Sequence, residues 1–248
     1  MPEPARDAGS EMTAAESLLK NKQHAGIREM FDEVAPKYDF LNHLLSAGND
    51  FYWRWRAKQY AASFLQAVAR PEILDIATGT GDLAVAMSEL QNANVVGVDL
   101  SDKMLDVARV KAPKIKFELG TAESLRFADG TFDLVTAGFG VRNFENLPKG
   151  IAELCRVLKA DGHIIIIEPM IPRPLWLRRL YLFYFKKILP KIARLVSDAS
   201  FAYDYLPRSV ETFPQCEAFL SVLTEAGFKD AAFHTMTFET AILYTARK

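Results

Sequence analysis

The 248-residue sequence contains little of what builds a cross-linked or metal-stabilised protein. It has only two cysteines, too few for a disulfide framework, and four histidines that lie far apart in the chain. Cys155 and Cys216 each fall in an apolar helical pattern, which is typical of a buried free thiol in a reducing compartment. No histidine has a cysteine or carboxylate cluster at metal-ligand spacing. We therefore expect no metal site.

Long uncharged apolar runs and an excess of one charge are also missing. No stretch reaches the roughly twenty apolar residues of a transmembrane helix. Residues 1–24 lack the apolar core of a secretory signal, so we expect a disordered tail followed by one domain over residues 25–248 in the cytoplasm. The formal net charge is −1, which gives no reason to expect nucleic-acid binding. The sequence leaves a homodimer open.

What is present is organised around one stretch, Glu72-Ile-Leu-Asp-Ile-Ala-Thr-Gly-Thr-Gly-Asp-Leu83. Its apolar run stops at two glycines, which predicts a buried parallel strand, a tight loop and a helix. Gly79 and Gly81 tolerate positive φ and let a ligand approach the backbone. About twenty residues later a second apolar run ends at Asp99, whose carboxylate can bind both hydroxyls of a ribose. The pattern predicts a nucleoside site.

The charge around this loop bears on which nucleoside binds. Residues 79–84 also fit the Gly-x-Gly-x-x-Gly/Ala pattern of dinucleotide-binding proteins, and glycines can serve a tight turn alone. Asp75 ends the strand and Asp82 opens the helix, so a pyrophosphate would meet negative charge there. S-adenosylmethionine carries an ammonium and a sulfonium, which acidic residues attract. The charge pattern favours the methyl donor over NAD.

Helical patterns precede and follow the predicted sheet strands. Residues 25–70 predict a helical flap that breaks at Pro36 and Gly48, and whose last helix has an apolar face under a basic one. After Asp99, strands and helices alternate as in a parallel sheet with helices on both faces. Ser101 is expected to cap a helix that runs through Met104, Leu105, Ala108 and Val110, and residues 164–167 are expected to form a strand that is buried on both faces.

The one strongly basic stretch lies between Ile171 and Val196, with seven Lys or Arg and no acid. On a helix, its basic residues share a face, and its aromatic and leucine side chains occupy most of the remainder. Over Leu175 to Leu189 this predicts a helix at a membrane surface, with a solvated surface helix as the alternative. Residues 171–210 are thus expected to form a helical lid after the fifth strand.

Five motifs together are similar to one family. They are Met30-Phe-Asp-Glu-Val-Ala-Pro-Lys-Tyr-Asp39, Leu41-Asn42 with Leu45-Ser46, Thr78-Gly-Thr-Gly-Asp82, Phe139-Gly-Val-Arg-Asn143, and Tyr205-Leu-Pro-Arg-Ser-Val210 with Phe213-Pro214. The chain resembles the C-methyltransferases of menaquinone and ubiquinone biosynthesis. The resemblance implies a class I S-adenosylmethionine-dependent methyltransferase fold, an α/β Rossmann-like domain with a seven-stranded, mostly parallel sheet whose seventh strand is antiparallel.

The resemblance also implies a site and a substrate. The methyl donor would contact Asp75, Gly79, Thr80, Gly81 and Asp99. It would also contact Thr121 and Ala122. The acceptor would be demethylmenaquinol or a polyprenyl methoxybenzoquinol, reached by peripheral contact with the inner face of a membrane.

Four further residues are catalytic candidates. Arg142 would stabilise a phenolate, with an ion pair to a helix as its alternative role, and Tyr38, Asp39 and His43 are candidates for accepting the proton. Two departures from the family pattern stand out: Thr121 replaces an Asn found in many members, and Thr237-Phe-Glu-Thr-Ala241 replaces a glycine-containing stretch. Fold alone leaves two other classes open, an NAD-linked oxidoreductase and a noncatalytic lipid-binding module.

Overall fold

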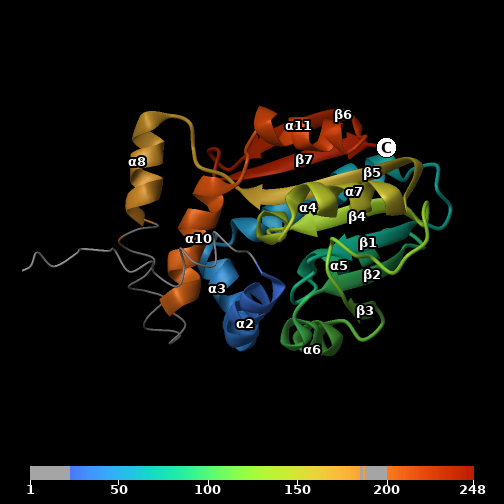
Figure 1. The fold of residues 1–248 in the computed structure, drawn as a ribbon, viewed down its shortest axis with the longest axis horizontal. Coiled ribbons are helices and arrows are strands. Elements are labelled where there is room, and N and C mark those ends of the chain that lie inside the picture. Colours follow the sequence, from blue (N-terminus) through green and yellow to red (C-terminus); the bar gives the residue numbers. More distant parts are fainter. Residues whose placement is uncertain (1–22, 185–186, 188–199) are drawn as a thin grey trace, which may run out of the picture.

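The computed structural model describes residues 23–184, 187 and 200–248. Within them, seven strands form one sheet in the order β3-β2-β1-β4-β5-β7-β6 (Figure 1). Strands β1 to β5 pair in parallel, and β7 is antiparallel to both β5 and β6. This arrangement confirms the expected fold class. The strands are β1 Glu72–Ile76, β2 Asn94–Asp99, β3 Lys116–Leu119, β4 Phe132–Gly138, β5 Leu158–Pro169, β6 Lys229–Met236 and β7 Ala241–Arg247.

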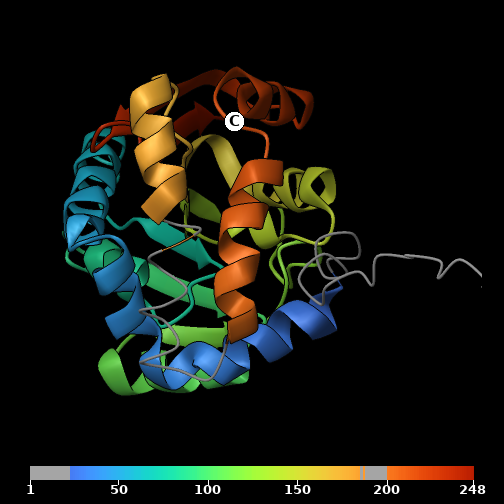
Figure 2. The same cartoon turned by 90° about the vertical axis from the view of Figure 1, so that its left-hand side faces the viewer.

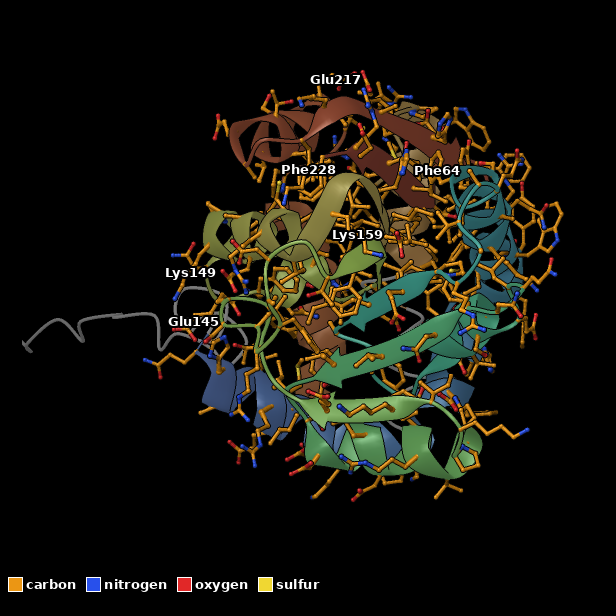
Figure 3. The ribbon with its side chains drawn as sticks, turned by 90° about the vertical axis from the view of Figure 1, so that its right-hand side faces the viewer. Phe64, Glu145, Lys149, Lys159, Glu217 and Phe228 are labelled. Atoms are coloured by element: carbon orange, nitrogen blue, oxygen red, sulfur yellow. The ribbon has the colours of Figure 1, made fainter. Side chains whose placement is uncertain are left out.

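The middle of β5 shows why the sheet needs helices on both faces. Residues 164–167 are all isoleucine and fully buried, as predicted. Because side chains alternate along a strand, Ile164 and Ile166 join one core cluster and Ile165 and Ile167 the other. Figure 3 views the end of the molecule where α4, with Phe64, and α7, with Lys149, lie on opposite sides of the sheet. The covering helices are α4 Asn49–Phe64, α5 Asp82–Ser88, α6 Asp102–Lys111, α7 Leu147–Val157 and α11 Glu217–Glu225.

A second group of helices gathers at the carboxyl ends of the parallel strands (Figures 1 and 2). Ligands of open parallel sheets bind at this edge. Two short 3₁₀ turns, η1 and η2, belong to the same end. The group comprises α2 His24–Val34, η1 Ala35–Lys37, α3 Tyr38–Leu45, η2 Val141–Asn143, α8 Leu175–Phe183 and α10 Ser200–Thr212.

Helix α4 differs from the expected apolar face under a basic one. Arg54 is buried, whereas Phe51 and Trp55 are 59% and 51% exposed. The reason is charge pairing: Arg54 Nη2 lies 2.7 Å from the fully buried carboxylate of Asp50, so the guanidinium is neutralised where a basic face was predicted. Gly48, at which the flap was expected to break, is the left-handed N-cap residue just before Asn49.

Two other expectations have mixed outcomes. Ser101 caps α6, since its hydroxyl accepts a hydrogen bond from the Met104 amide, but Val110 is 85% exposed and lies outside the core. Of the tail expected at residues 1–24, residues 1–22 lie outside the described residues, whereas His24 already belongs to α2. The surface helix expected over Leu175 to Leu189 is described only in part, and its first part forms α8, which ends at Phe183.

Candidate active site

The glycine loop is anchored by Asp75 at the end of β1. Its two carboxylate oxygens accept hydrogen bonds from the hydroxyls of Thr78 and Thr136, at 2.5 and 2.6 Å. Burial raises the pKa of Asp75 to about 6, against the effect of these hydroxyls. Gly79 and Gly81 have φ of 55° and 85°, a region that favours glycine. The loop therefore has the predicted conformation, and Asp75 holds it in place from below.

Asp99 ends β2 and turns its carboxylate toward this loop. Oδ2 accepts a hydrogen bond from the Gly79 amide at 2.8 Å, and Oδ1 accepts one from the Ser101 amide at 2.9 Å. Burial raises the pKa of Asp99 to about 6, although both amides favour the charged form. Each oxygen keeps a second lone pair, so the carboxylate can still accept ligand hydroxyls.

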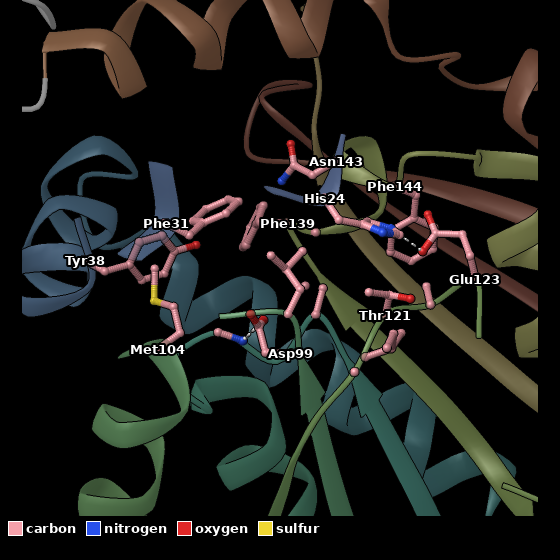
Figure 4. Close-up of a pocket in the computed structure, with 18 residues that line it drawn as sticks. His24, Phe31, Tyr38, Asp99, Met104, Thr121, Glu123, Phe139, Asn143 and Phe144 are labelled. Atoms are coloured by element: carbon pink, nitrogen blue, oxygen red, sulfur yellow. Dashed lines mark hydrogen bonds and ion pairs between the residues drawn. The ribbon is translucent and has the colours of Figure 1, made fainter. Parts of the chain in front are cut away.

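A cavity of about 50 Å³ opens above Asp99, and we call it the Asp99 cavity (Figure 4). Four of the residues predicted to bind the methyl donor line it, namely Gly79, Asp99, Thr121 and Ala122. Thr80 and Asp75 line a neighbouring recess of about 40 Å³ below the glycine loop. Gly81 lines neither space. A Cβ there would lie 3.1 Å from the Phe117 ring, so this glycine permits close packing of the loop.

The Asp99 cavity also contains residues that the sequence did not single out. His24 and Glu123 close one end, with His24 Nε2 3.1 Å from a Glu123 carboxylate oxygen. The same imidazole lies 3.1 Å from Glu145 through Nδ1. Phe144 and Asn143, which follow β4, form part of the wall. The Phe139-Gly-Val-Arg-Asn143 motif was a signal for Asn143, whereas no local pattern marked His24 or Phe144.

A larger apolar cavity of about 320 Å³ lies beside the first, and we call it the Arg142 cavity. It is lined by α2 and α3, the first half of α4, the loop after β4, the end of β5, α8, α10, and the turn between β6 and β7. Three aromatic residues, Phe31, Tyr38 and Phe139, line both cavities. Phe139 has a φ of 61°, a strained conformation for a bulky residue that is common at functional sites. The two cavities thus meet at these three rings.

Arg142 is buried at the wall of its cavity and forms an ion pair with Glu168 of β5. Nη1 lies 2.9 Å from Glu168 Oε2 and also donates to the Phe139 carbonyl, while the Arg142 amide donates to Oε1 at 3.2 Å. Burial is the largest influence and works against the charge, but Glu168, Tyr38 and Tyr205 together keep the pKa of Arg142 above its ordinary value. The ion pair joins the loop to a strand rather than to a helix, and it holds a protonated guanidinium, paired with Glu168, at the wall of the cavity.

The three predicted proton acceptors lie in different places. Tyr38 borders both cavities, but burial raises its pKa to about 12, so it is a phenol at neutral pH. Asp39 Oδ1 accepts a hydrogen bond from Thr80 at 2.5 Å, and Oδ2 lies 2.6 Å from Lys111 Nζ. His43 lies 2.6 Å from Asp50. Neither Asp39 nor His43 lines either cavity.

Asp39 and His43 instead belong to a charge network between the flap and the glycine loop. Arg54 is central: it contacts Asp50 at 2.7 Å and Asp82 at 3.4 Å. Lys111 joins Asp82 to Asp39. His43, Asp50 and Asp82 present ligand atoms within 4.8 Å of one another, but the Arg54 guanidinium already provides the cation for both carboxylates. This network holds α3 and α4 against the start of α5.

The turn between β6 and β7 contains the sequence departure noted above. Thr237, Phe238 and Glu239 all have positive φ, of 44°, 54° and 61°. Two contacts hold this strained turn: Trp53 Nε1 donates to Thr237 at 2.8 Å, and Glu239 pairs with Arg173 at 2.6 Å. Without glycine, the turn keeps a side chain, Phe238, at the rim of the Arg142 cavity.

Curated relatives are similar to most of the chain. A demethylmenaquinone methyltransferase from Chlorobaculum parvum is 56% identical over 239 residues, which are 96% of this chain and 99% of the relative. One from Bacteroides fragilis is 41% identical over 92% of this chain and 94% of its own. A ubiquinone/menaquinone biosynthesis C-methyltransferase UbiE from Geotalea uraniireducens is also 41% identical, over 90% of this chain and 96% of its own.

Solved structures resemble the chain in fold alone. A possible histamine N-methyltransferase from Thermotoga maritima has a TM-score of 0.59 at 18% identity, over 89% of this chain and 99% of its own. The Haemonchus contortus phosphoethanolamine N-methyltransferase 2, solved with S-adenosylhomocysteine, has a TM-score of 0.58 at 16% identity, over 78% of this chain and 52% of its own. The family model of the ubiE/COQ5 methyltransferases matches residues 18–248, and this chain therefore belongs to the ubiE/COQ5 methyltransferase family.

Proposed function

We propose that this enzyme transfers a methyl group from S-adenosylmethionine to a ring carbon of demethylmenaquinol. One observation carries the proposal: a small cavity with a ribose-type carboxylate meets a large apolar cavity with a buried cation, at Phe31, Tyr38 and Phe139. A methyl donor and an apolar ring acceptor need that arrangement, because the reacting carbon must approach the methyl group in line with its bond to sulfur.

The charge of the Asp99 cavity supports S-adenosylmethionine rather than NAD. Of the described residues that line it, none is Lys or Arg, and two, Asp99 and Glu123, are acids. The negative charge of a pyrophosphate would have no basic side chain to balance it there, whereas a cationic ligand suits the two acids. In this assignment Asp99 binds the ribose hydroxyls, Gly79, Thr80 and Gly81 border the amino-acid end, and Thr121 and Ala122 border the adenine. Asp75 acts through the loop.

The reaction assigned to Arg142 follows from the chemistry of a quinol. Loss of a phenolic proton makes the neighbouring ring carbon nucleophilic, and the fixed guanidinium charge stabilises the phenolate in an apolar cavity. The carbon then forms a bond to the methyl group as the sulfur–methyl bond breaks. The sulfur keeps the electron pair, and the ring carbon loses its proton to restore aromaticity. An oxidised quinone has no phenol to ionise and would not react.

Tyr38 is the one of the three proton-acceptor candidates that we keep at the reacting groups. Because its phenol is protonated at neutral pH, we assign it a hydrogen bond to the acceptor rather than the role of base. Asp39 and His43 are assigned to the network that holds the flap over the donor.

We further propose that α8 contacts a membrane surface, where a polyprenyl tail resides. Leu175, Trp176, Leu180 and Phe183 are 57–72% exposed on this helix. Arg178 and Arg179 add positive charge, which anionic lipid headgroups attract. Phe238, at the rim of the Arg142 cavity, is exposed too. No helix among the described residues has the length and apolar character needed to cross a bilayer, so the contact would be peripheral.

The proposal is tested with purified protein and two short-tailed quinols, one naphthalene-based and one a methoxybenzoquinol. We expect S-adenosylhomocysteine and a ring-methylated naphthoquinol, and calorimetric binding of S-adenosylmethionine but not of NAD. Preferred methylation of the benzoquinol would reassign the acceptor. Tighter binding of NAD would contradict the methyltransferase proposal.

The membrane contact has its own test. Vesicles with anionic lipid should retain the protein, and the double variant Trp176→Ser and Phe183→Ser should release it while keeping its activity on a detergent-dispersed short-tailed quinol. Equal retention of both proteins would leave α8 as a solvated surface helix.

A further inference from the structure

Asn143 has a buried polar group that the proposed chemistry has not used. The side chain is 5% exposed and lies in η2, one residue after Arg142. Its Oδ1 accepts a hydrogen bond from the Tyr205 hydroxyl at 3.0 Å. Its Nδ2 is buried and has no hydrogen-bond partner among the described residues. Because native proteins pair nearly all buried N–H groups, such a donor calls for an explanation.

The amide is held so that this nitrogen faces the Asp99 cavity. Tyr205 lies in α10 and is buried, which raises its pKa to about 12, so its hydroxyl keeps the proton that it donates to Oδ1. The oxygen end of the amide therefore points to α10. Figure 4 shows the nitrogen end directed toward Phe31 and Phe139, two of the rings at which the cavities meet.

The backbone around η2 makes this placement rigid. A Cβ at Gly140 would lie only 2.4 Å from the Ala77 Cβ, so the loop after β4 packs directly on the loop after β1. The backbone N–H of Asn143 donates a hydrogen bond to the Gly140 carbonyl at 3.0 Å and closes the turn. The Arg142 backbone is fixed to Glu168 from the other side. The side chain of Asn143 thus has little freedom to find another partner.

We infer that Asn143 Nδ2 donates a hydrogen bond to the acceptor oxygen next to the carbon that receives the methyl group. The inference rests on the proposed function. That oxygen is bonded to the ring atom beside the reacting carbon, so it must lie where the two cavities meet. The second ring oxygen of a para-quinol lies at the far end of the ring, inside the Arg142 cavity.

The assignment gives Asn143 and Arg142 different tasks. The guanidinium supplies charge, but its Nη1 is already shared with Glu168 and the Phe139 carbonyl. The amide supplies a directed, neutral donor to the developing phenolate, and an amide cannot take the proton itself. Asn143 is then a catalytic residue, and Tyr205 is a positioning residue that fixes its orientation.

The test compares Asn143→Ala and Asn143→Asp with wild type on a reduced naphthoquinol across pH 6 to 10. We expect Asn143→Ala to lower kcat by about 10²-fold, the usual effect of losing one hydrogen-bond donor to an oxyanion. The Kd for S-adenosylmethionine should stay within about twofold of the wild-type value. The rise of kcat with pH should move to higher pH, because the phenolate is stabilised less. Asn143→Asp should lose more, since a carboxylate repels the phenolate. Tyr205→Phe should give a smaller shift in the same direction.

Gln215→Ala is the matched control, since this side-chain amide, outside both cavities, ties Val210 in the last turn of α10 to the backbone of Ile171 after β5. It should lower the melting temperature without moving the pH profile. An unchanged pH profile in folded Asn143→Ala would overturn the inference. A Kd for S-adenosylmethionine raised tenfold or more would also overturn it, because the side-chain amide would then bind the methyl donor. Wild type that binds the donor but methylates no quinol would overturn the proposed function and this assignment together.

Discussion

The Asp99 cavity and the Arg142 cavity share a wall of three aromatic rings but are built in different ways. The Asp99 cavity is formed mainly by loops that directly follow β1, β2, β3 and β4, so the sheet itself sets its geometry. The Arg142 cavity shares the loop after β4, but most of its wall comes from helices and a turn that are separate in the sequence, and α8 has no buried residue of its own.

This difference suggests a division of labour. A site fixed by a rigid sheet suits a ligand that must be held in one orientation. A cavity closed by peripheral helices suits an acceptor whose long tail must enter and leave. Changes on the sheet side should therefore affect donor binding and turnover strongly, and changes on the helix side should affect access and stability more moderately.

The largest effect is expected from the buried pair at the boundary. Removing Arg142 alone would leave Glu168 buried without its cation, which typically costs about 3–5 kcal/mol of stability. The double variant Arg142→Met and Glu168→Gln avoids that penalty. It should fold and bind the donor with unchanged affinity, yet lower kcat by about 10²-fold, because the phenolate loses its charged stabiliser.

Calorimetry for the donor and steady-state kinetics for the quinol check this expectation. The control is Glu168→Gln alone, which keeps the guanidinium and should lose far less of kcat. Activity of the double variant close to wild type would mean that Arg142 serves only to join the loop to β5.

The next largest effect is expected at Asp99. Asp99→Asn should weaken donor binding by about 1–3 kcal/mol, because charge-assisted hydrogen bonds to the ribose are lost, and should leave the KM for the quinol nearly constant. Titration calorimetry measures the change. A quinol KM that rises as much as the donor Kd would contradict the separation of the two cavities.

A pH dependence follows from the same carboxylate. Asp75 and Asp99 have pKa values of about 6, raised by burial from 3.8. The folded state then binds protons more tightly than the unfolded state, so the free protein loses stability as the pH rises from 3.8 to about 6. Donor binding has the opposite sign, since the ribose needs the ionised Asp99, and its affinity should fall below about pH 6.

Calorimetry at pH 5.5 in buffers of different ionisation enthalpy should detect proton release on donor binding, and Asp99→Asn should remove most of it. Proton uptake instead, or no linked proton in the wild-type protein, would contradict the assignment of Asp99.

The smallest effect is expected at the strained turn on the helix side. Phe238→Gly removes a side chain from a left-handed position and should stabilise the protein by about 1 kcal/mol in thermal unfolding. It should also weaken retention on anionic vesicles. Leu220, a half-buried residue of α11 that packs against the core, offers a control: Leu220→Gly should destabilise the protein and leave vesicle binding intact. A destabilised Phe238→Gly would show that the turn is not strained.

The two cavities were also unequally predictable from the sequence. Asp99 and the glycine loop could be predicted because a strand, a turn and a helix are local patterns with a fixed geometry. Arg54 could not, because its burial depends on Asp50 and Asp82, which come from two helices. Asp39 and His43 carried the right chemistry for proton transfer, but their partners turn them away from the cavities. His24 is held at the Asp99 cavity by Glu123 and Glu145, and no spacing in the sequence indicates these contacts.

The central claim is that the two cavities bring a ring carbon of a reduced quinol to the methyl donor. It is tested most directly with trideuteromethyl S-adenosylmethionine and demethylmenaquinol under anaerobic conditions, with mass spectrometry and NMR of the product. We predict one trideuteromethyl group on the ring carbon for each S-adenosylhomocysteine formed, and no product from the oxidised quinone. A label on oxygen, or turnover of the quinone without a reductant, would contradict the account.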